Sequence, residues 1–398
     1  MEGESMKTGS KGRRLFRRPL LAVGLTAGSL AAVAVFGLPS AGIAAASTNV
    51  SCAAGQTGLI AAINAANSSG GGTINLAAGC TYQLSGVDNS DPMTGDNALP
   101  VITSRIALNG RGTTLADDGT ARILRVDAPG GNLTLNGLTL TGGFNTFAGG
   151  AIFNNEGTLT LNGSLVTGNA APAGGGIASG TNRPGPIGTT TLNNSQVTNN
   201  FAFGAGGGGI INHAGTLTLN SSVVSGNTAP GGGGIASGKG NPDAGESLVV
   251  LNKSKVDNNT AGEDGGGGIA NGGTLVSNNS EIAGNTSPGG AGAGLLNHGD
   301  SATLNKTTVS GNTAPNDGSA DGFGGGIANV NFGLPSTPVV ALTLNNSQVT
   351  GNSASGGGGG IINADFGGPA TVTLNHTQVS ANDPDNCEPS GTIAGCSG

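Results

Sequence analysis

A ten-residue pattern of alternating apolar and polar positions recurs along most of the chain. The stretch TLNNSQVTNN, residues 191–200, returns almost unchanged as TLNNSQVTGN at residues 343–352. In each copy leucines alternate with threonines before an asparagine, and a β-branched aliphatic residue follows four positions later. Alternation with a period of two is typical of a strand that has one buried face and one solvated face. Each copy therefore predicts two short strands joined by a turn at the asparagine.

Two asparagines, always seven residues apart, define the repeat. The first asparagine of each copy is Asn162, Asn193, Asn220, Asn252, Asn278, Asn305, Asn345 or Asn375. The second is Asn169, Asn200, Asn227, Asn259, Asn285, Asn312, Asn352 or Asn382. Successive first asparagines lie 31, 27, 32, 26, 27, 40 and 30 residues apart, and a looser copy begins at Asn132. The basic unit is therefore about 27 residues long and carries insertions.

A third apolar position follows a run of glycines in each unit and predicts a third strand. It is occupied by Ile177, Ile210, Ile235, Ile269, Leu295, Ile327 and Ile361. One unit buries about four aliphatic side chains, roughly 6 to 12 kcal/mol, which is less than the cost of ordering ~27 residues. Such units are stable only when they stack and hydrogen-bond at about 4.8 Å. We predict an all-β fold, a single-stranded parallel β-helix.

The turn residues have structural explanations. Asparagine tolerates left-handed backbone conformation, and stacked asparagine amides can hydrogen-bond from coil to coil. Glycine before the isoleucine permits a positive φ and close approach of neighbouring coils. An N-x-S/T pattern matches at all eight first asparagines. We interpret it as a turn in which the hydroxyl caps backbone amides, with N-glycosylation as the alternative.

The ends of the stack carry their own signals. The segment QTGLIAAINAAN, residues 56–67, places Leu59, Ile60 and Ile63 on one helical face and predicts an N-terminal cap. The four cysteines form two local pairs, Cys52 with Cys80 and Cys387 with Cys396, which predict two disulfides in an exported protein. A metal site is the weaker alternative, because neither pair has C-x-x-C spacing.

Residues 1–46 have the pattern of an export signal. A basic stretch, residues 11–18, precedes the apolar run 20–38, and Ala44 and Ala46 supply a cleavage motif. An uncleaved membrane anchor is the alternative, and the export route stays open. The predicted organisation is a signal peptide (1–46), a cap with irregular first coils (47–131), the repeat β-helix (132–386) and a disulfide-closed tail (387–398).

Charge and composition narrow the classes of partner that this protein is expected to bind. Residues 47–398 keep 9 of the 15 basic and 20 of the 22 acidic residues, so the net charge changes from −7 to about −11. An acidic surface disfavours nucleic acid and anionic lipid. With 79 glycines, 35% hydrophobic residues and 17 prolines, the composition fits neither collagen nor simple disorder. We expect an extracellular or surface-associated monomer without a membrane span after residue 46.

These residues carry a resemblance to a known family. CAAGQTGLIAAINAANSSGGGTINLAAGC, LPVITSRIALNGRGTTL and the TLTLNGSLVTGNAAPAGGGI copies resemble exported bacterial right-handed parallel β-helix proteins of the pectate-lyase-like superfamily. GGAIFNN, residues 149–155, is also similar to the repeat of polymorphic outer-membrane proteins. The resemblance covers residues 50–386 and implies right-handed coiling, in agreement with the general rule for parallel crossovers. It implies a fold more strongly than a function.

Catalytic motifs of the related pectin-degrading enzymes, N-T-D, G-H-G and R-I-K, do not occur in this sequence. We interpret Asp117-Asp118 as a solvated turn, and Glu263-Asp264 likewise, with a weak surface calcium site as the alternative at the latter pair. His213 and His298 share a column but lie three coils apart, about 14 Å, so they cannot share a metal. We predict no catalytic residues and no metal or other cofactor.

The insertions all leave the coil at one corner, after the third strand. Long loops gathered on one side of a rigid stack favour a contact surface, although drift in tolerated loops explains them equally well. The candidate ligand-contact residues are Asn182, Arg183, Lys239, Asn241, Asp243, Glu246, Asn329, Asn331 and Asp365. We predict a non-enzymatic module that binds polysaccharide or a surface protein. The alternatives are a polysaccharide lyase or hydrolase and a purely structural surface protein.

Overall fold

The computed structural model describes residues 47–181, 187–238, 245–318, 320–333 and 339–396. These described residues form one compact unit. The predicted export segment lies outside the described residues. Within them no helix is both long and apolar enough to cross a membrane.

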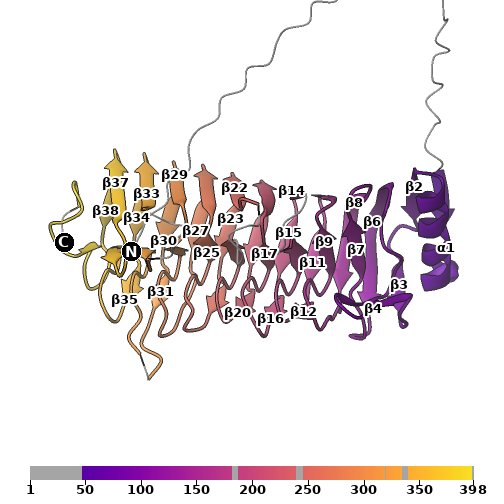
Figure 1. Ribbon diagram of the computed structural model, residues 1–398, viewed down its shortest axis with the longest axis horizontal. Helices are drawn as coiled ribbons and strands as arrows, with labels where there is room; N and C mark the ends of the chain where they lie inside the picture. Colours follow the sequence, from indigo (N-terminus) through magenta and orange to yellow (C-terminus); the bar gives the residue numbers. More distant parts are fainter. Residues whose placement is uncertain (1–46, 182–186, 239–244, 319, 334–338, 397–398) are drawn as a thin grey trace, which may run out of the picture. The chain divides into compact units, whose positions relative to one another are not determined.

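Eleven coils stack in sequence order, and equivalent strands pair in parallel from coil to coil (Figure 1). Registers join asparagine to asparagine, for example Asn193 to Asn162 and Asn220 to Asn193. The first strands of the coils are β2 (Gly71–Leu76), β6 (Arg105–Asp117), β8 (Asn132–Thr141), β10 (Thr158–Asn162), β14 (Gly188–Asn193), β18 (Gly215–Asn220), β22 (Leu248–Asn252), β26 (Thr274–Asn278), β29 (Ser301–Asn305), β33 (Val340–Asn345) and β37 (Ala370–Asn375).

The second strands follow the asparagine turn. They are β3 (Thr81–Leu84), β11 (Leu165–Thr167), β15 (Gln196–Thr198), β19 (Val223–Ser225), β23 (Lys255–Asp257), β27 (Glu281–Ala283), β30 (Thr308–Ser310), β34 (Gln348–Thr350) and β38 (Gln378–Ser380). In β6 and β8 the first and second strands are continuous, so all of them form one sheet together with β1 (Ser47–Val50).

The strands that follow the glycine runs form a separate ten-stranded sheet, here called the glycine-side sheet. They are β7 (Leu124–Asp127), β9 (Ile152–Asn155), β13 (Ile177–Ser179), β17 (Ile210–Asn212), β21 (Ile235–Gly238), β25 (Ile269–Gly272), β28 (Leu295–Asn297), β32 (Ile327–Asn331), β36 (Ile361–Asp365) and β39 (Cys387–Glu388). The three strands predicted for each coil are therefore confirmed.

A further short strand, which the sequence pattern did not predict, follows the second asparagine. It is two residues long in β12 (Ala170–Ala171), β16 (Phe201–Ala202), β20 (Thr228–Ala229), β24 (Thr260–Ala261), β31 (Thr313–Ala314) and β35 (Ser353–Ala354). Two residues are too few to show a period of two, which is why alternation alone missed it.

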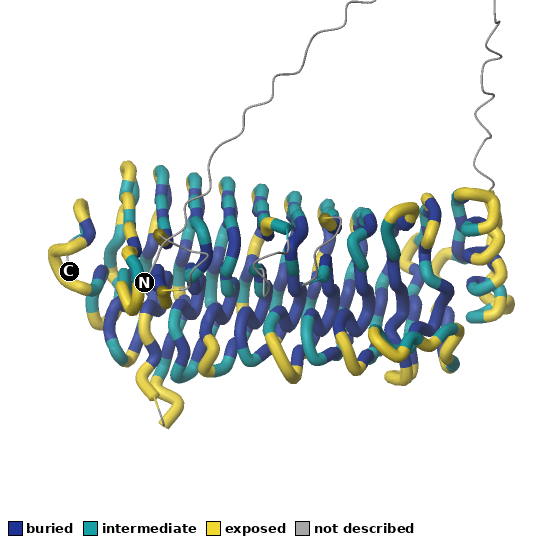
Figure 2. Tube along the Cα trace, in the orientation of Figure 1, coloured by how far each residue is buried: buried dark blue, intermediate teal, exposed yellow. Residues whose placement is uncertain are grey.

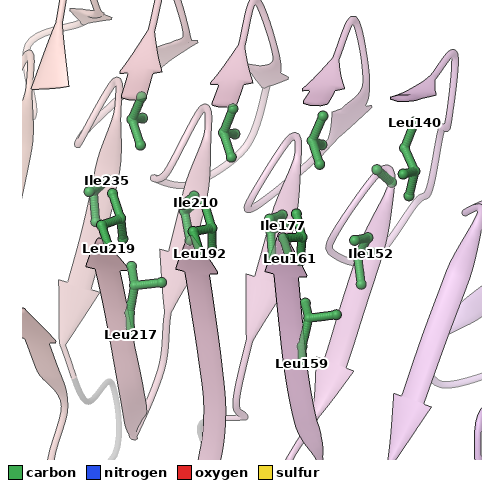
Figure 3. Packing of buried hydrophobic residues seen from close by; sticks show 14 of the residues in the cluster. Leu140, Ile152, Leu159, Leu161, Ile177, Leu192, Ile210, Leu217, Leu219 and Ile235 are labelled. Carbon is green, nitrogen blue, oxygen red and sulfur yellow. The ribbon is translucent and has the colours of Figure 1, made fainter. Parts of the chain in front are cut away.

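Buried residues run the length of the stack (Figure 2). The hydrophobic ones among them form a core of aliphatic columns. One column contains Ile152, Ile177, Ile210 and Ile235, and another contains Leu161, Leu192 and Leu219, all of them excluded from solvent (Figure 3). Each strand therefore buries the face that the alternation predicts. Because every coil sees the same neighbours above and below, the same residue type recurs in each column.

Asparagine side chains form two continuous ladders. The outer ladder is half-exposed, and each of its side-chain amides donates to the asparagine of the preceding coil, as Asn193 does to Asn162 at 2.8 Å. This ladder contains Asn49, Asn75, Asn109, Asn136 and all eight first asparagines. In the inner ladder each amide donates to the following coil; it joins the eight second asparagines and ends at Asn386.

The ladders confirm the stacked-amide prediction but correct its backbone part. None of the sixteen repeat asparagines has a positive φ; the left-handed residues are their neighbours, such as Asn194 after Asn193 and Asn199 before Asn200. The asparagines are therefore required for their side chains. The hydroxyl prediction is confirmed, since the buried Ser222 hydroxyl accepts from the Ser195 amide and donates to the Leu192 carbonyl.

The glycine runs have both predicted roles: they adopt a positive φ and they let neighbouring coils approach closely. Gly207 has a φ of 72°, and a side chain on Gly208 would collide with the carbonyl oxygens of Gly233 and Thr228 in the next coil.

Both ends of the stack are closed as predicted. Helix α1 (Gly55–Ser68) lies at one end (Figure 1) and buries Leu59 and Ile63, with Ile60 partly buried beside them. The Cys52–Cys80 disulfide ties the segment preceding α1 to the first coil, and the Cys387–Cys396 disulfide closes the tail at the other end.

Candidate functional site

The insertions leave the stack where the strands of the glycine-side sheet end, and we call this edge the loop corner. Five of the candidate contact residues, Asn182, Arg183, Lys239, Asn241 and Asp243, lie outside the described residues. Glu246 and Asp365 are described and exposed. Asp365 also accepts the Ala370 amide at 2.6 Å, so its carboxylate shapes the loop that it begins.

Two of the candidate contact residues are used by the scaffold instead. Asn329 and Asn331 are both excluded from solvent. Asn329 donates to Asn363 at 2.8 Å, within a third amide ladder that also contains Asn271 and Asn297, while Asn331 donates to the Pro369 carbonyl. Their polar side chains point inward, because in a strand the residue two after the buried isoleucine lies on the same face. The prediction that they contact a ligand is therefore wrong.

At the N-terminal end of the loop corner lies a groove of about 500 Å³ that crosses four coils. Its floor is the outer face of the glycine-side sheet, where Arg125, Phe153 and Ala178 occupy paired positions. One wall is the antiparallel hairpin of β4 (Asn89–Asp91) and β5 (Gly95–Asn97). The remaining lining residues are Asp91, Met93, Thr94, Phe147, Ala148, Asn155, Ala173, Gly180, Thr181 and His213.

Arg125 organises the polar end of the groove. Its guanidinium contacts Asp91 and Asp127, each at 2.7 Å, and donates to the Thr94 hydroxyl. The Arg125 hydrogen bond holds the pKa of Asp91 far below its usual range. Asp91 is thereby fixed as an anion that accepts hydrogen bonds, and it cannot serve as a proton donor near neutral pH.

A second arginine, Arg122, lies behind the floor without any exposure. It donates to Asn97 at 2.7 Å, to the carbonyls of Thr94 and Ala148, and its guanidinium lies 5.0 Å from the centre of the Phe153 ring. Burial, and next the charge of Arg125, lower the pKa of Arg122, while the carboxylates of Asp127 and Asp91 oppose this shift. This buried cation fastens the β4–β5 hairpin to the coils and orients Phe153.

His213 forms the opposite end of the groove. Burial lowers the pKa of this imidazole, so it is neutral at pH 7. Its Nδ1 lies 3.3 Å from the Gly238 carbonyl oxygen, which can only accept. The proton therefore belongs on Nδ1, and Nε2 is a hydrogen-bond acceptor.

Farther along the loop corner, after strands β32 and β36, the surface carries exposed aromatic rings. The Phe332 and Phe366 rings stack, with centroids 6.2 Å apart and planes 13° apart, and His298 lies 6.1 Å from Phe332. Phe332 is 51% exposed and Phe366 is 72% exposed. His213 and His298 occupy equivalent register positions three coils apart, which confirms their predicted column.

The exposed rings are unusual for this chain. Apart from Tyr82 and Phe153, its buried hydrophobic residues carry no aromatic ring, and six of the eight phenylalanines after residue 46 are at least 40% exposed. None of the six occupies an inward column of the repeat. The aromatic residues therefore contribute to the surface, and the loop corner holds a stacked pair of them.

The acidic pairs behave differently from each other. Asp117 caps a turn as predicted, accepting the amides of Gly119, Thr120 and Ala121, but it is buried rather than solvated, and burial raises its pKa. Glu263 and Asp264 lie in an exposed turn. Among the described residues no cluster of three His, Cys, Asp or Glu side chains could hold a metal ion.

Comparisons with known proteins find similarity only among solved structures. No protein-family model matches the chain, and no curated protein matches it. The chain is similar to the A-module of Azotobacter vinelandii mannuronan C-5 epimerase AlgE6, with 15% identity and a TM-score of 0.43, over 82% of this chain and 95% of that one. It is also similar to the AlgE4 A-module of the same organism, with 15% identity and a TM-score of 0.45, over 86% of this chain and 96% of that one.

Proposed function

We propose that this protein is a non-catalytic β-helix that binds polysaccharide along its loop corner. The observation that carries the proposal is the stacked pair Phe332 and Phe366, which stays largely exposed in a chain that buries few aromatic rings, Tyr82 and Phe153 among them. Leaving aromatic surface in water costs about 25 cal/mol per Å², and contiguous exposed apolar surface marks interaction sites. A rigid pair of rings matches the apolar C–H face of a sugar.

The groove supplies the polar half of such a surface. Asp91, Thr181 and the neutral His213 place carboxylate, hydroxyl and imidazole groups beside the apolar part of the floor, which Phe153 and Ala178 form. Sugar hydroxyls both donate and accept, so fixed groups of both kinds beside aromatic surface suit them. A binding site that runs from coil to coil suits a polymer better than a small molecule.

The catalytic alternative rests on one residue. Neutral His213, with its Nε2 unprotonated, has the form that a general base requires. However, the described lining of the groove has no carboxyl group with a raised pKa, because Asp91 is held as an anion by Arg125. A hydrolase needs such an acid to protonate the leaving group. The groove therefore supports binding better than hydrolysis.

A panel of immobilised plant and bacterial polysaccharides tests the proposal, with retention and soluble products read in the same wells. We expect retention without products, weakened strongly by Phe332→Ala combined with Phe366→Ala. Phe201→Ala is the matched control, since Phe201 is 48% exposed but lies on the short strand β16, away from the loop corner. No retention on any polysaccharide contradicts the proposal. Products that disappear in His213→Ala favour the enzyme.

A further inference from the structure

A second surface, at the asparagine turn between the first and second strands, carries most of the chain's lysines. Four lysines follow residue 46, and three of them, Lys253, Lys255 and Lys306, lie on this surface. They line an open hollow of about 460 Å³ that continues, through Lys306 and Thr308, into a second of about 300 Å³ reaching His376. We call the two hollows the lysine furrow.

Basic and amide side chains alternate along the lysine furrow from one coil to the next. The residues that follow the outer-ladder asparagines in five successive coils are Lys253, Asn279, Lys306, Asn346 and His376. Their φ angles are all between 49° and 51°, so their side chains leave the backbone in the same direction. A basic side chain therefore recurs at every second coil, about 10 Å apart, with an amide between each pair.

The backbone at these positions favours other residues. A left-handed conformation costs a residue with a Cβ about 1 to 2 kcal/mol, and asparagine and glycine bear it best. Glycine or asparagine fills this place at Gly137, Gly163 and Asn194. Lysine at 253 and 306 therefore goes against local preference, and strain of this kind concentrates at functional positions.

The two lysines are also available to a ligand. Lys255, on the neighbouring strand β23, is held by Glu281 at 2.6 Å. Lys253 and Lys306 are exposed, and neither forms an ion pair with any described residue. The acidic groups near them are Glu281, which Lys255 neutralises, and Asp257, at the end of β23. Lys253 and Lys306 are thus two unpaired cations in the same column of a protein whose net charge is negative.

We propose that the lysine furrow binds an acidic polysaccharide in which charged and uncharged sugars alternate, lying parallel to the stack. Lys253 and Lys306 meet anionic groups on alternate sugars, while the amides of Asn279 and Asn346 bind the neutral sugars between them. The lining of the furrow contains one ring, the imidazole of His376, so it offers no row of aromatic side chains on which successive nucleic-acid bases could stack. The furrow and the loop corner lie at opposite ends of the first strands, so this proposal stands independently of the proposed function.

The test uses the full protein at low salt with four probes: hyaluronan, whose uronic acids alternate with a neutral amino sugar, dextran sulfate, uncharged dextran and single-stranded DNA. We expect hyaluronan to bind and affinity to fall with added salt. An exposed ion pair contributes roughly two- to five-fold in affinity, so Lys253→Asn with Lys306→Asn should weaken binding about ten-fold. Asparagine already occupies this left-handed position in other coils, so the fold is kept.

A second variant separates spacing from net charge. Lys253→Asn with Asn279→Lys keeps the charge constant but places the two lysines in adjacent coils. We expect it to bind hyaluronan several-fold more weakly than the native protein, whereas the Phe332→Ala, Phe366→Ala pair changes affinity less than two-fold. Undiminished binding by the moved-lysine variant, preferential binding of dextran sulfate or DNA, or no binding of hyaluronan would overturn the proposal.

Discussion

The side-chain amide of Asn227 donates a 2.9 Å hydrogen bond to Oδ1 of Asn259 in the next coil, and both side chains are excluded from solvent. Asn259 Oδ1 also accepts the Asn227 backbone amide at 3.0 Å, and its own amide donates to the Val224 carbonyl. The Asn259 amide also donates to Oδ1 of Asn285 in the following coil, so this asparagine satisfies buried groups in the coils on both sides of it. The ladder couples coils that would not fold alone.

Replacing Asn259 with alanine should destabilise the protein by about 3 kcal/mol. The change leaves two Asn227 donors and the Val224 carbonyl buried without a partner, and each orphaned group costs about 1 to 3 kcal/mol. Asn278→Ala in the half-exposed outer ladder is the matched control, and it should cost less than about 1 kcal/mol because water can replace the lost bonds. Urea unfolding of both variants measures the difference; equal losses would show that burial does not set the contribution of a ladder.

The glycine runs give a sharper steric contrast. Gly208→Ala should cost about 3 kcal/mol or more, because its Cβ would meet the carbonyl oxygens of Gly233 and Thr228 and force neighbouring coils apart. Gly163→Asn should cost less than about 1 kcal/mol, since no atom lies within 4 Å of a Cβ there and Asn194 fills the same left-handed place one coil later. Thermal unfolding distinguishes them, and a tolerated Gly208→Ala would mean that the coils can separate freely.

Stability should fall as the pH drops below about 6.5. Burial lowers the pKa of both His213 and His298. Between the lowered folded pKa and the ordinary unfolded value of about 6.5, the unfolded chain binds more protons, so acid favours unfolding. Each histidine contributes at most about 1.4 kcal/mol per pH unit.

The urea midpoint, measured between pH 7.5 and pH 5.5 for the native protein and for His213→Gln combined with His298→Gln, tests this slope. We expect the native midpoint to decline more steeply. Parallel profiles would show that both imidazoles accept protons in the folded state.

The repeat could be predicted from the sequence because each coil supplies an independent copy of the same evidence. Eight invariant asparagine spacings and seven aliphatic residues after glycine define the registers that the strands adopt. The caps could be predicted because the amphipathic segment around Leu59 and the local cysteine pairs each need only short-range information.

The groove could not be predicted, because it depends on residues outside the repeat. Asp91 reaches Arg125 through the β4–β5 hairpin, 34 residues away in a region without a periodic register. Asn331 was misplaced because strand β32 extends two residues farther than β28 in the coil before it, and its burial continues to its end. Asn329 was misplaced because its pairing with Asn297 in the third amide ladder was not recognised. The position of the phenylalanines off the inward columns was a usable signal for the loop corner.

The measurement that tests the proposed function most directly is calorimetric titration of the protein with a soluble fragment of the polysaccharide that it retains, with the sugar analysed afterwards. We expect Phe332→Ala combined with Phe366→Ala to weaken binding at least ten-fold, Phe201→Ala to change it less than two-fold, and the recovered sugar to be intact. Equal affinity of the native and double-variant proteins, or a chemically altered sugar, would contradict a non-catalytic binding surface at the loop corner.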